Sequence, residues 1–147
     1  MDIAGNQTNL LIRFHLYKKI IFLSLTVGEK TAIVNQKPIF LDFPPQIIQG
    51  RTLVPIRFIA DGFGAKVEWK AATKEILIQL DNHILELQIS NKKAKLDKKQ
   101  TIYLDVPPQI IQGRTLVPIR FIADGFGAKV EWKAATKEIL IQYFQSY

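Results

Sequence analysis

Residues 41–79 read LDFPPQIIQGRTLVPIRFIADGFGAKVEWKAATKEILIQ, and residues 104–142 read LDVPPQIIQGRTLVPIRFIADGFGAKVEWKAATKEILIQ. The two stretches lie 63 residues apart and match at 38 of 39 positions, the exception being Phe43 against Val106. Upstream, residues 27–40 and 89–103 agree at only four of 14 positions. Recent recombination, or an artefact of sequence assembly, leaves such an abrupt change in identity between the two parts of a repeat. The chain is therefore a duplication, with an N-terminal tail or mis-called start (1–20) followed by two repeats, 21–82 and 83–147.

The first half of each repeat predicts a hairpin and a short helix. Residues 32–34 and 39–42 flank the turn 35–37, which is typical of two paired strands. Pro44-Pro45 ends that pairing because proline has no N–H to donate. Pro55 and Gly64 then stand where a helix favours its first residue and its terminating residue. Between them, apolar residues follow helical spacing on one stripe: Ile56, Ile59, Ala60 and Phe63.

The second half predicts another hairpin, in which apolar residues alternate with polar ones over 66–70 and 76–80. A strand over 84–89 leads into the second repeat, and its counterpart before the first repeat is 21–27. The fold class is thus α+β, a mainly antiparallel sheet with two short helices. Two tandem β-β-α-β-β units are expected in a pseudo-symmetric arrangement. Helices this short are not stable alone, so they must pack on a sheet.

The composition excludes several classes of protein. The 147 residues include no Cys, two His and one Met, which leaves no disulfide framework, thiol nucleophile, iron–sulfur cluster or soft-metal site. Apolar residues make up 48% and charged residues 22%, as in globular proteins. We expect no cofactor and no catalytic activity.

The N-terminal region has no segment long and apolar enough to span a membrane, which needs about 18 apolar residues. Lys18-Lys19 followed by the apolar run 20–25 resembles the start of a secretory signal, but no small-residue cleavage site follows. We expect no intact signal peptide.

The run PPQIIQGRTLVPIRFIADGFGAKVEWKAATKEILI, present at 44–78 and 107–141, resembles the copper amine oxidase-like N-terminal (stalk) domain family. That family is marked by Pro-Pro, by Gly-Arg-Thr-Leu-Val-Pro-hydrophobic-Arg, by an apolar helix and by Val-Glu-Trp. The resemblance implies a small non-catalytic α+β module of an exported or cell-wall-associated bacterial protein, without copper chemistry of its own. The chain departs from the pattern at the first turn, where Asn-Gly-Lys is usual, and at Gly62, which costs a helix about 1 kcal/mol relative to Ala.

The tryptophans Trp69 and Trp132 are the first candidate binding residues, since flat aromatic rings stack on the apolar faces of sugars. Each tryptophan follows an inward-facing valine, Val67 or Val130, by two residues and so points to the same face of its strand. This placement favours packing in the core. Phe58 and Phe121 lie off the helix stripe and could form an exposed patch for a partner or for the other repeat. The loops 45–50 and 108–113 are a second possible contact surface.

The duplicated arginines are the next candidates. Arg51 and Arg114 could bind a carboxylate or phosphate, although contacts with carbonyl groups near the Pro-Pro turn are favoured. Arg57 is expected to pair with Asp61 or Glu68. Glu68, flanked by lysines on a polar strand face, is expected to be surface charge rather than a catalytic acid.

The net charge of +7 is concentrated in one run of lysines, which comprises Lys92, Lys93, Lys95, Lys98 and Lys99. A solvated hairpin that protects a sheet edge is the favoured explanation, and a polyanion site is the alternative. No aromatic residue is interleaved in the run to stack a base, so nucleic acid is an unlikely partner.

Together these observations favour a non-catalytic stalk or adhesion-type module that acts as a spacer or binds a wall polymer, a polysaccharide or a surface protein. The alternative is a carbohydrate-binding module that uses Trp69 and Trp132.

Overall fold

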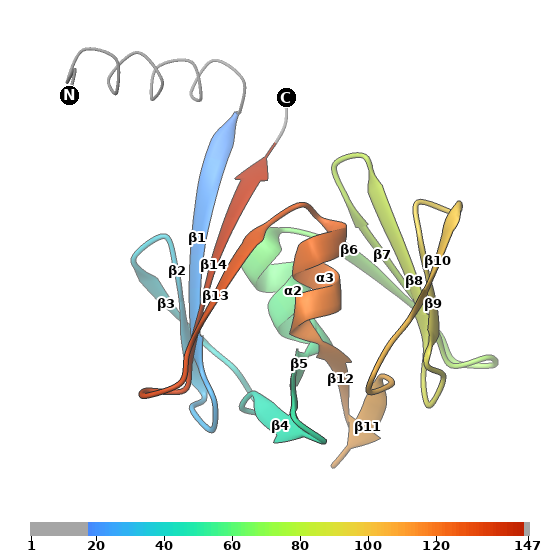
Figure 1. Cartoon of the computed structure of the whole chain (residues 1–147), viewed down its shortest axis with the longest axis horizontal. Coiled ribbons are helices and arrows are strands. Elements are labelled where there is room, and N and C mark those ends of the chain that lie inside the picture. The colour runs from blue at the N-terminus through green and yellow to red at the C-terminus, as the bar shows by residue number, and fades with distance from the viewer. Residues whose placement is uncertain (1–17, 146–147) are drawn as a thin grey trace.

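The computed structural model describes residues 18–145, which form three antiparallel sheets around two short helices. Sheets A and C have five strands each and stand on opposite sides of the helices, whereas the four-stranded sheet B lies at one end of them (Figure 1). The architecture is the expected α+β class. Among the described residues, the Tyr143 hydroxyl is the one polar side-chain group carried by a buried residue, and the rest of the core is apolar.

Sheet C joins the end of the first repeat to the beginning of the second. Its strand order is β10-β9-β8-β7-β6, and β7 and β8 pair along six residue pairs across a two-residue turn. The buried residues of β7 are Ile76, Ile78 and Leu80, as the alternation predicts. The strands are β6 (Lys66–Lys70), β7 (Glu75–Leu80), β8 (His83–Gln88), β9 (Lys93–Leu96) and β10 (Gln100–Tyr103).

Sheet A joins the beginning of the first repeat to the end of the second. Its order is β13-β14-β1-β2-β3, and β1 pairs with β14 along eight residue pairs, from Lys19 opposite Gln145 to Thr26 opposite Glu138. The final hairpin of each repeat therefore completes a sheet with the opening strands of the other repeat. The strands are β1 (Lys19–Thr26), β2 (Thr31–Val34), β3 (Lys37–Phe40), β13 (Lys129–Lys133) and β14 (Glu138–Gln145).

The turns of the first hairpins adopt positive φ without glycine. Asn35 and Gln36 have φ of 49° and 68°, and Asp97 and Lys98 have 54° and 59°. Asn and Asp tolerate this region better than other non-glycine residues, and two positive φ values match the right-handed twist of a hairpin. The side chains also help, because Asn35 and Asp97 accept hydrogen bonds from the backbone N–H groups of the neighbouring strands, both at 2.8 Å.

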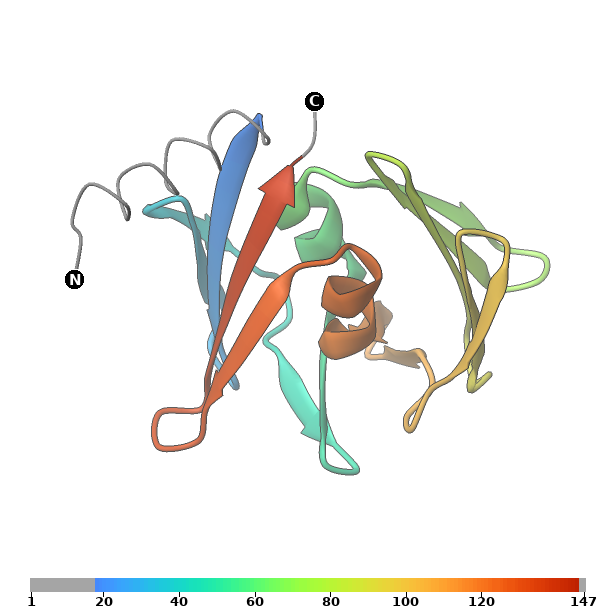
Figure 2. The same ribbon diagram turned by 45° about the horizontal axis from the view of Figure 1, so that its top comes forward.

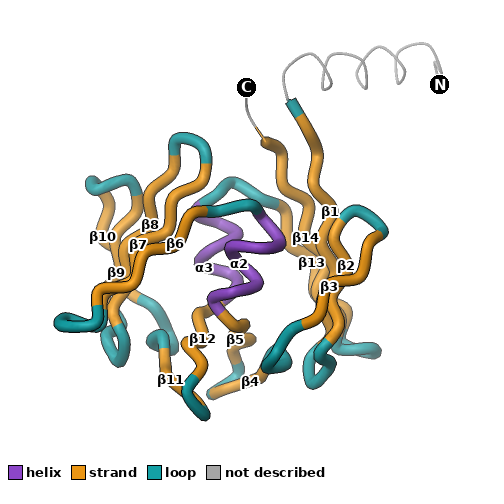
Figure 3. Tube along the Cα trace, turned by 180° about the vertical axis from the view of Figure 1, so that it is seen from behind, coloured by secondary structure: helices purple, strands orange, loops and turns teal. Residues whose placement is uncertain are grey.

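Sheet B was not expected from the sequence. The segment after Pro-Pro, predicted to be a loop, forms a small hairpin in each repeat, and the two hairpins pair through β5 and β12 in the order β11-β12-β5-β4 (Figure 3). Val54 lies opposite Val117 at this junction, and both are fully buried. The strands are β4 (Gln46–Ile48), β5 (Arg51–Pro55), β11 (Gln109–Ile111) and β12 (Arg114–Pro118).

The helices are α2 (Ile56–Phe63) and α3 (Ile119–Gly125), which lie beside each other between the large sheets (Figure 2). Gly64 caps α2 at φ 77°, as predicted. The predicted stripe is buried throughout α3, and in α2 it is buried at Ile59 and Phe63 and partly buried at Ile56 and Ala60. The stripe is not the whole buried surface, because Phe58 and Phe121, which lie off it, are buried as well. Each helix has neighbours on several sides, so it buries more than one stripe.

Glycine lets each helix approach a sheet closely. A Cβ atom on Gly62 would lie 2.8 Å from the Leu23 side chain of β1, and one on Gly125 would lie 2.6 Å from Leu85 of β8. Both leucines are buried and closely packed, so they have little room to move. Gly62 therefore permits close packing, and the lower helix propensity expected from the sequence is offset by this contact.

An aromatic cluster links the two repeats at the C-terminal ends of the helices. Phe63 and Phe126, which occupy equivalent positions, meet edge to face with their ring centroids 5.4 Å apart. Tyr143 packs against both rings, and its hydroxyl group donates a hydrogen bond to Asp81 in the turn between β7 and β8. Burial and this hydrogen bond raise the pKa of Tyr143. A side chain from sheet A is thus bonded to sheet C.

Candidate functional site

The two tryptophans lie beside the turns of the β6–β7 and β13–β14 hairpins and are about half exposed. Their parity is as predicted, because Trp69 pairs with Ile76 and Trp132 pairs with Ile139, both of which are buried. However, β6 and β13 are edge strands, so no further strand covers the indoles, which are 46% and 41% exposed. The prediction of core packing is therefore wrong for both.

Each tryptophan forms a wall of a cleft, and the two clefts are related by the duplication. We name them the Trp132 cleft, with a volume of about 530 Å³, and the Trp69 cleft, with about 190 Å³. The lining of the Trp69 cleft consists of Ile56, Val67, Trp69, Ile76 and Thr115. Every one of these positions has its equivalent in the Trp132 cleft: Ile119, Val130, Trp132, Ile139 and Thr52.

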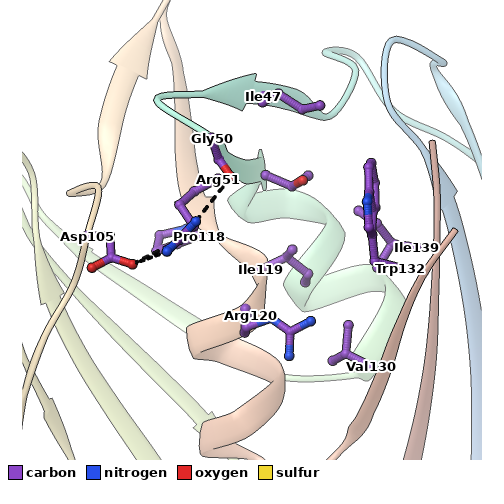
Figure 4. A pocket seen from close by; sticks show the side chains of 11 residues that line it. Ile47, Gly50, Arg51, Asp105, Pro118, Ile119, Arg120, Val130, Trp132 and Ile139 are labelled. Atoms are coloured by element: carbon purple, nitrogen blue, oxygen red, sulfur yellow. Dashed lines mark hydrogen bonds and ion pairs between the residues drawn. The ribbon is translucent and has the colours of Figure 1, made fainter. Parts of the chain in front are cut away.

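The Trp132 cleft has additional polar walls (Figure 4). They come from the tip of the β4–β5 hairpin, from the segment before β11 and from the start of α3. The additional residues include Gly50, Arg51, Asp105 and Arg120. The Trp69 cleft has no charged residue in its lining. Two clefts built from the same repeated sequence therefore differ in size and in charge.

Cross-repeat ion pairs account for Arg51 and Arg114. Arg51 donates to Asp105 through Nε at 2.9 Å and Nη2 at 2.5 Å, and Arg114 Nε lies 2.8 Å from Asp42. Arg51 also contacts the Gly50 carbonyl at 3.3 Å, but its main partner is a carboxylate and not a carbonyl group near the Pro-Pro turn. Each arginine thus binds the aspartate of the other repeat.

The helix arginines differ between the repeats. Arg57 lies 3.8 Å from Asp42, so the expected pairing with Asp61 or Glu68 is wrong. The side chain of the equivalent Arg120 makes no ion pair or hydrogen bond within residues 18–145. Its guanidinium group extends from α3 beside Val130 in the Trp132 cleft (Figure 4). Of the four repeated arginines, Arg120 is the one whose charge no carboxylate in the described chain offsets.

The lysine run lies on the β9–β10 hairpin at the edge of sheet C, and all five side chains are exposed: Lys92, Lys93, Lys95, Lys98 and Lys99. Lys93 lies opposite Tyr103 in the strand register, and Tyr103 is 74% exposed. The run of lysines in the sequence does not reveal this neighbour, because the aromatic residue belongs to the following strand. The position equivalent to Tyr103 is Phe40, which is equally exposed.

The outer face of sheet A has an apolar groove of about 590 Å³. Phe22, Ile33 and Leu140 contribute to its lining. In sheet C, the positions equivalent to Ser24 and Ile33 are Glu86 and Lys95, which lie opposite each other in the register. The two outer faces therefore differ in chemistry, because they are built from the diverged halves of the repeats.

The described residues contain no group of three His, Asp or Glu side chains that could hold a metal ion, so they do not fit a copper site. His83 contacts Asp97 at 3.4 Å, and His15 lies outside the described residues. Glu68 lies 3.6 Å from Lys66, as expected for surface charge. Among residues 18–145, no helix is both long and apolar enough to cross a bilayer.

The fold and the clefts together define a small, duplicated α+β module with an apolar core and polar groups at its surface. The family model for the copper amine oxidase N-terminal domain matches residues 13–78 and 33–141, in two overlapping matches that fit a tandem repeat. The chain belongs to this family, whose domain is a non-catalytic part of copper amine oxidases. No curated protein matches the sequence.

Proposed function

We propose that the protein is a non-catalytic stalk-type module of a bacterial envelope or secreted protein, and that it acts as a binder of an anionic wall polymer or a surface partner. The family supports the non-catalytic part of this proposal.

The pairing of β1 with β14 is the observation that favours a binder over a spacer. Lys19 lies opposite Gln145, so the chain enters and leaves the module at neighbouring points. A spacer adds length only when its ends are far apart, whereas this module would project sideways from any chain that carries it (Figure 1). A projecting module is well placed to bind a partner.

A cell-wall sedimentation assay tests the proposal. The purified chain is mixed with insoluble bacterial cell wall, and the fraction in the pellet is measured against salt concentration. We expect retention that weakens with salt, because the contacts are ionic. Lys92, Lys95 and Lys98, each replaced by Glu, should reduce retention at least tenfold. Lys70, Lys133 and Lys137, replaced in the same way, change the charge equally at other exposed positions and should retain binding.

Carbohydrate binding by Trp69 and Trp132 is a second candidate function. It is favoured by the partial exposure of both indoles, each of which forms a wall of a cleft. A concave site with an aromatic wall and a few polar groups is typical of small-ligand binding. The Trp emission of the chain, measured with and without neutral and acidic polysaccharides, tests this function. An unchanged spectrum with every polysaccharide would contradict it.

A further inference from the structure

The Trp132 cleft combines an aromatic wall with a cation that lacks an internal partner. Arg51 is held by Asp105, so these two residues nearly cancel each other's charge within the cleft. Arg120 remains, and no carboxylate among residues 18–145 forms an ion pair with it. Asp124, one helical turn along α3, does not pair with it either. The cleft therefore carries a net positive charge beside an exposed indole.

We propose that the Trp132 cleft binds a single sugar unit that bears a carboxylate, with its ring on the Trp132 indole and its carboxylate on the Arg120 guanidinium. The proposal rests on the carbohydrate-binding candidate function and narrows it to one cleft and one ligand class. Guanidinium groups bind carboxylates through paired N–H donors, which gives both strength and orientation.

The size of the cleft supports one occupied site instead of two. Small-molecule sites typically have volumes of about 300–1,000 Å³. The Trp132 cleft, at about 530 Å³, falls within this range, and the Trp69 cleft, at about 190 Å³, falls below it. The Trp69 cleft also lacks the cation, because the equivalent Arg57 lies beside Asp42 and does not line it.

The duplication supplies a matched control for each residue of the proposed site. Trp69→Phe leaves Trp132 as the single tryptophan, so its emission reports on the proposed site alone. Arg57→Gln removes the equivalent arginine from the same position of the other helix. Both substitutions fall on exposed side chains, so we expect the fold to be kept.

The experiment titrates the full-length Trp69→Phe variant with a short oligogalacturonate, with its methyl ester and with inorganic polyphosphate. We expect the acidic oligosaccharide to shift the Trp132 emission and the methyl ester to bind at least tenfold more weakly. Arg120→Gln in this background should weaken binding at least tenfold, whereas Arg57→Gln should change it less than twofold. Calorimetry with Trp132→Ala should show a similar loss without relying on fluorescence.

Several outcomes would overturn the proposal. No binding of oligogalacturonate at millimolar concentration, equal binding of the methyl ester, or equal effects of Arg57→Gln and Arg120→Gln would each contradict it. Stronger binding of polyphosphate than of oligogalacturonate would show a charge-only site. The wall-sedimentation assay is independent of these results, since its lysines lie on the β9–β10 hairpin outside the Trp132 cleft. If the chain sediments with cell wall but does not bind oligogalacturonate, the module is still a binder, and the Trp132 cleft is not its sugar-binding site.

Discussion

Tyr143 is the residue at which the two large sheets are bonded to each other. Its ring packs on Phe63 and Phe126, and its hydroxyl group donates to Asp81. We expect Tyr143→Phe to lower the free energy of unfolding by about 1–2 kcal/mol, because the hydrogen bond to a carboxylate is lost while the ring packing is kept. Urea unfolding measures this change. Tyr103→Phe removes an exposed hydroxyl group and should shift stability by less than about 0.5 kcal/mol; an equal effect of both would contradict the assignment.

Asp97 gives the fold a dependence on acid pH. The hydrogen bond from Ile84 is the main cause of its lowered pKa, with smaller contributions from His83 and Lys99. A carboxyl group with a lowered pKa stabilises the fold above its ordinary value of 3.8, and this stabilisation is lost as pH falls through and below that value.

The equivalent turn of the first repeat provides the test, because Asn35 makes the same hydrogen bond without a charge. We expect Asp97→Asn to keep the turn and to flatten the acid limb of the stability curve. Urea midpoints measured from neutral pH to below pH 3.8 compare the two proteins. Identical acid limbs would show that Asp97 contributes nothing to the pH dependence.

The predictions for single residues were correct where the alternation of side chains along a strand alone determines which face a side chain points to. Ile76, Ile78 and the inward side of Trp69 followed from the alternation. The exposure of Trp69 could not be predicted, since it depends on β6 being an edge strand. Nor could the lack of a partner for Arg120, because Arg57 in the same sequence context has one.

At the scale of elements, α3 packs on sheet C because Gly125 leaves room for Leu85. Alanine is the better helix former by about 1 kcal/mol, yet its Cβ atom would lie 2.6 Å from the Leu85 side chain. We expect Gly125→Ala to destabilise the protein by about 1–3 kcal/mol, the usual cost of overpacking. Thermal unfolding measures the loss. Adding Leu85→Val should recover part of it; a Gly125→Ala protein more stable than the parent would contradict close packing.

The hairpins and helices were predicted from turn residues and periodicity, but sheet B was not. β4 and β11 have only three residues each, which is too short for an alternation to be recognised. Their strand character depends on β5 and β12, which pair across the repeats. The burial of Phe58 and Phe121 has a similar origin, since a single helix stripe cannot reveal how many neighbours a helix has.

At the scale of the whole molecule, the β1–β14 junction and the β7–β8 junction are equivalent, but only the second is covalently connected. We therefore expect a circular permutant to fold, with residue 145 joined to residue 19 by a short Gly-Ser linker and the chain opened between Asp81 and Asn82. Its stability should lie within about 2 kcal/mol of the parent, because the pairs between strands are unchanged. Circular dichroism and urea unfolding check this. An unfolded permutant would show that the β7–β8 turn is indispensable.

The exchange of hairpins between repeats could not be deduced from the sequence. Residues 66–79 and 129–142 are identical, so either hairpin could pair with β1 or with β8. The two-residue turn between β7 and β8 commits the first hairpin to sheet C, which leaves the second for β1. The decision depends on connectivity and not on side chains.

That exchange also bears on the evolutionary origin of the chain. One repeat by itself would have two unpaired strand edges. Its opening strand, equivalent to β1, would lack a hairpin to pair with, and its final hairpin would lack an opening strand to pair with. Two copies would satisfy both by reciprocal pairing about a two-fold axis, as in an isologous homodimer. A single-repeat ancestor is therefore expected to have been a symmetric dimer, which gene fusion then turned into one chain. Fusion also freed the two halves to diverge separately, and the different outer faces of sheets A and C are what a dimer of identical subunits could not have had.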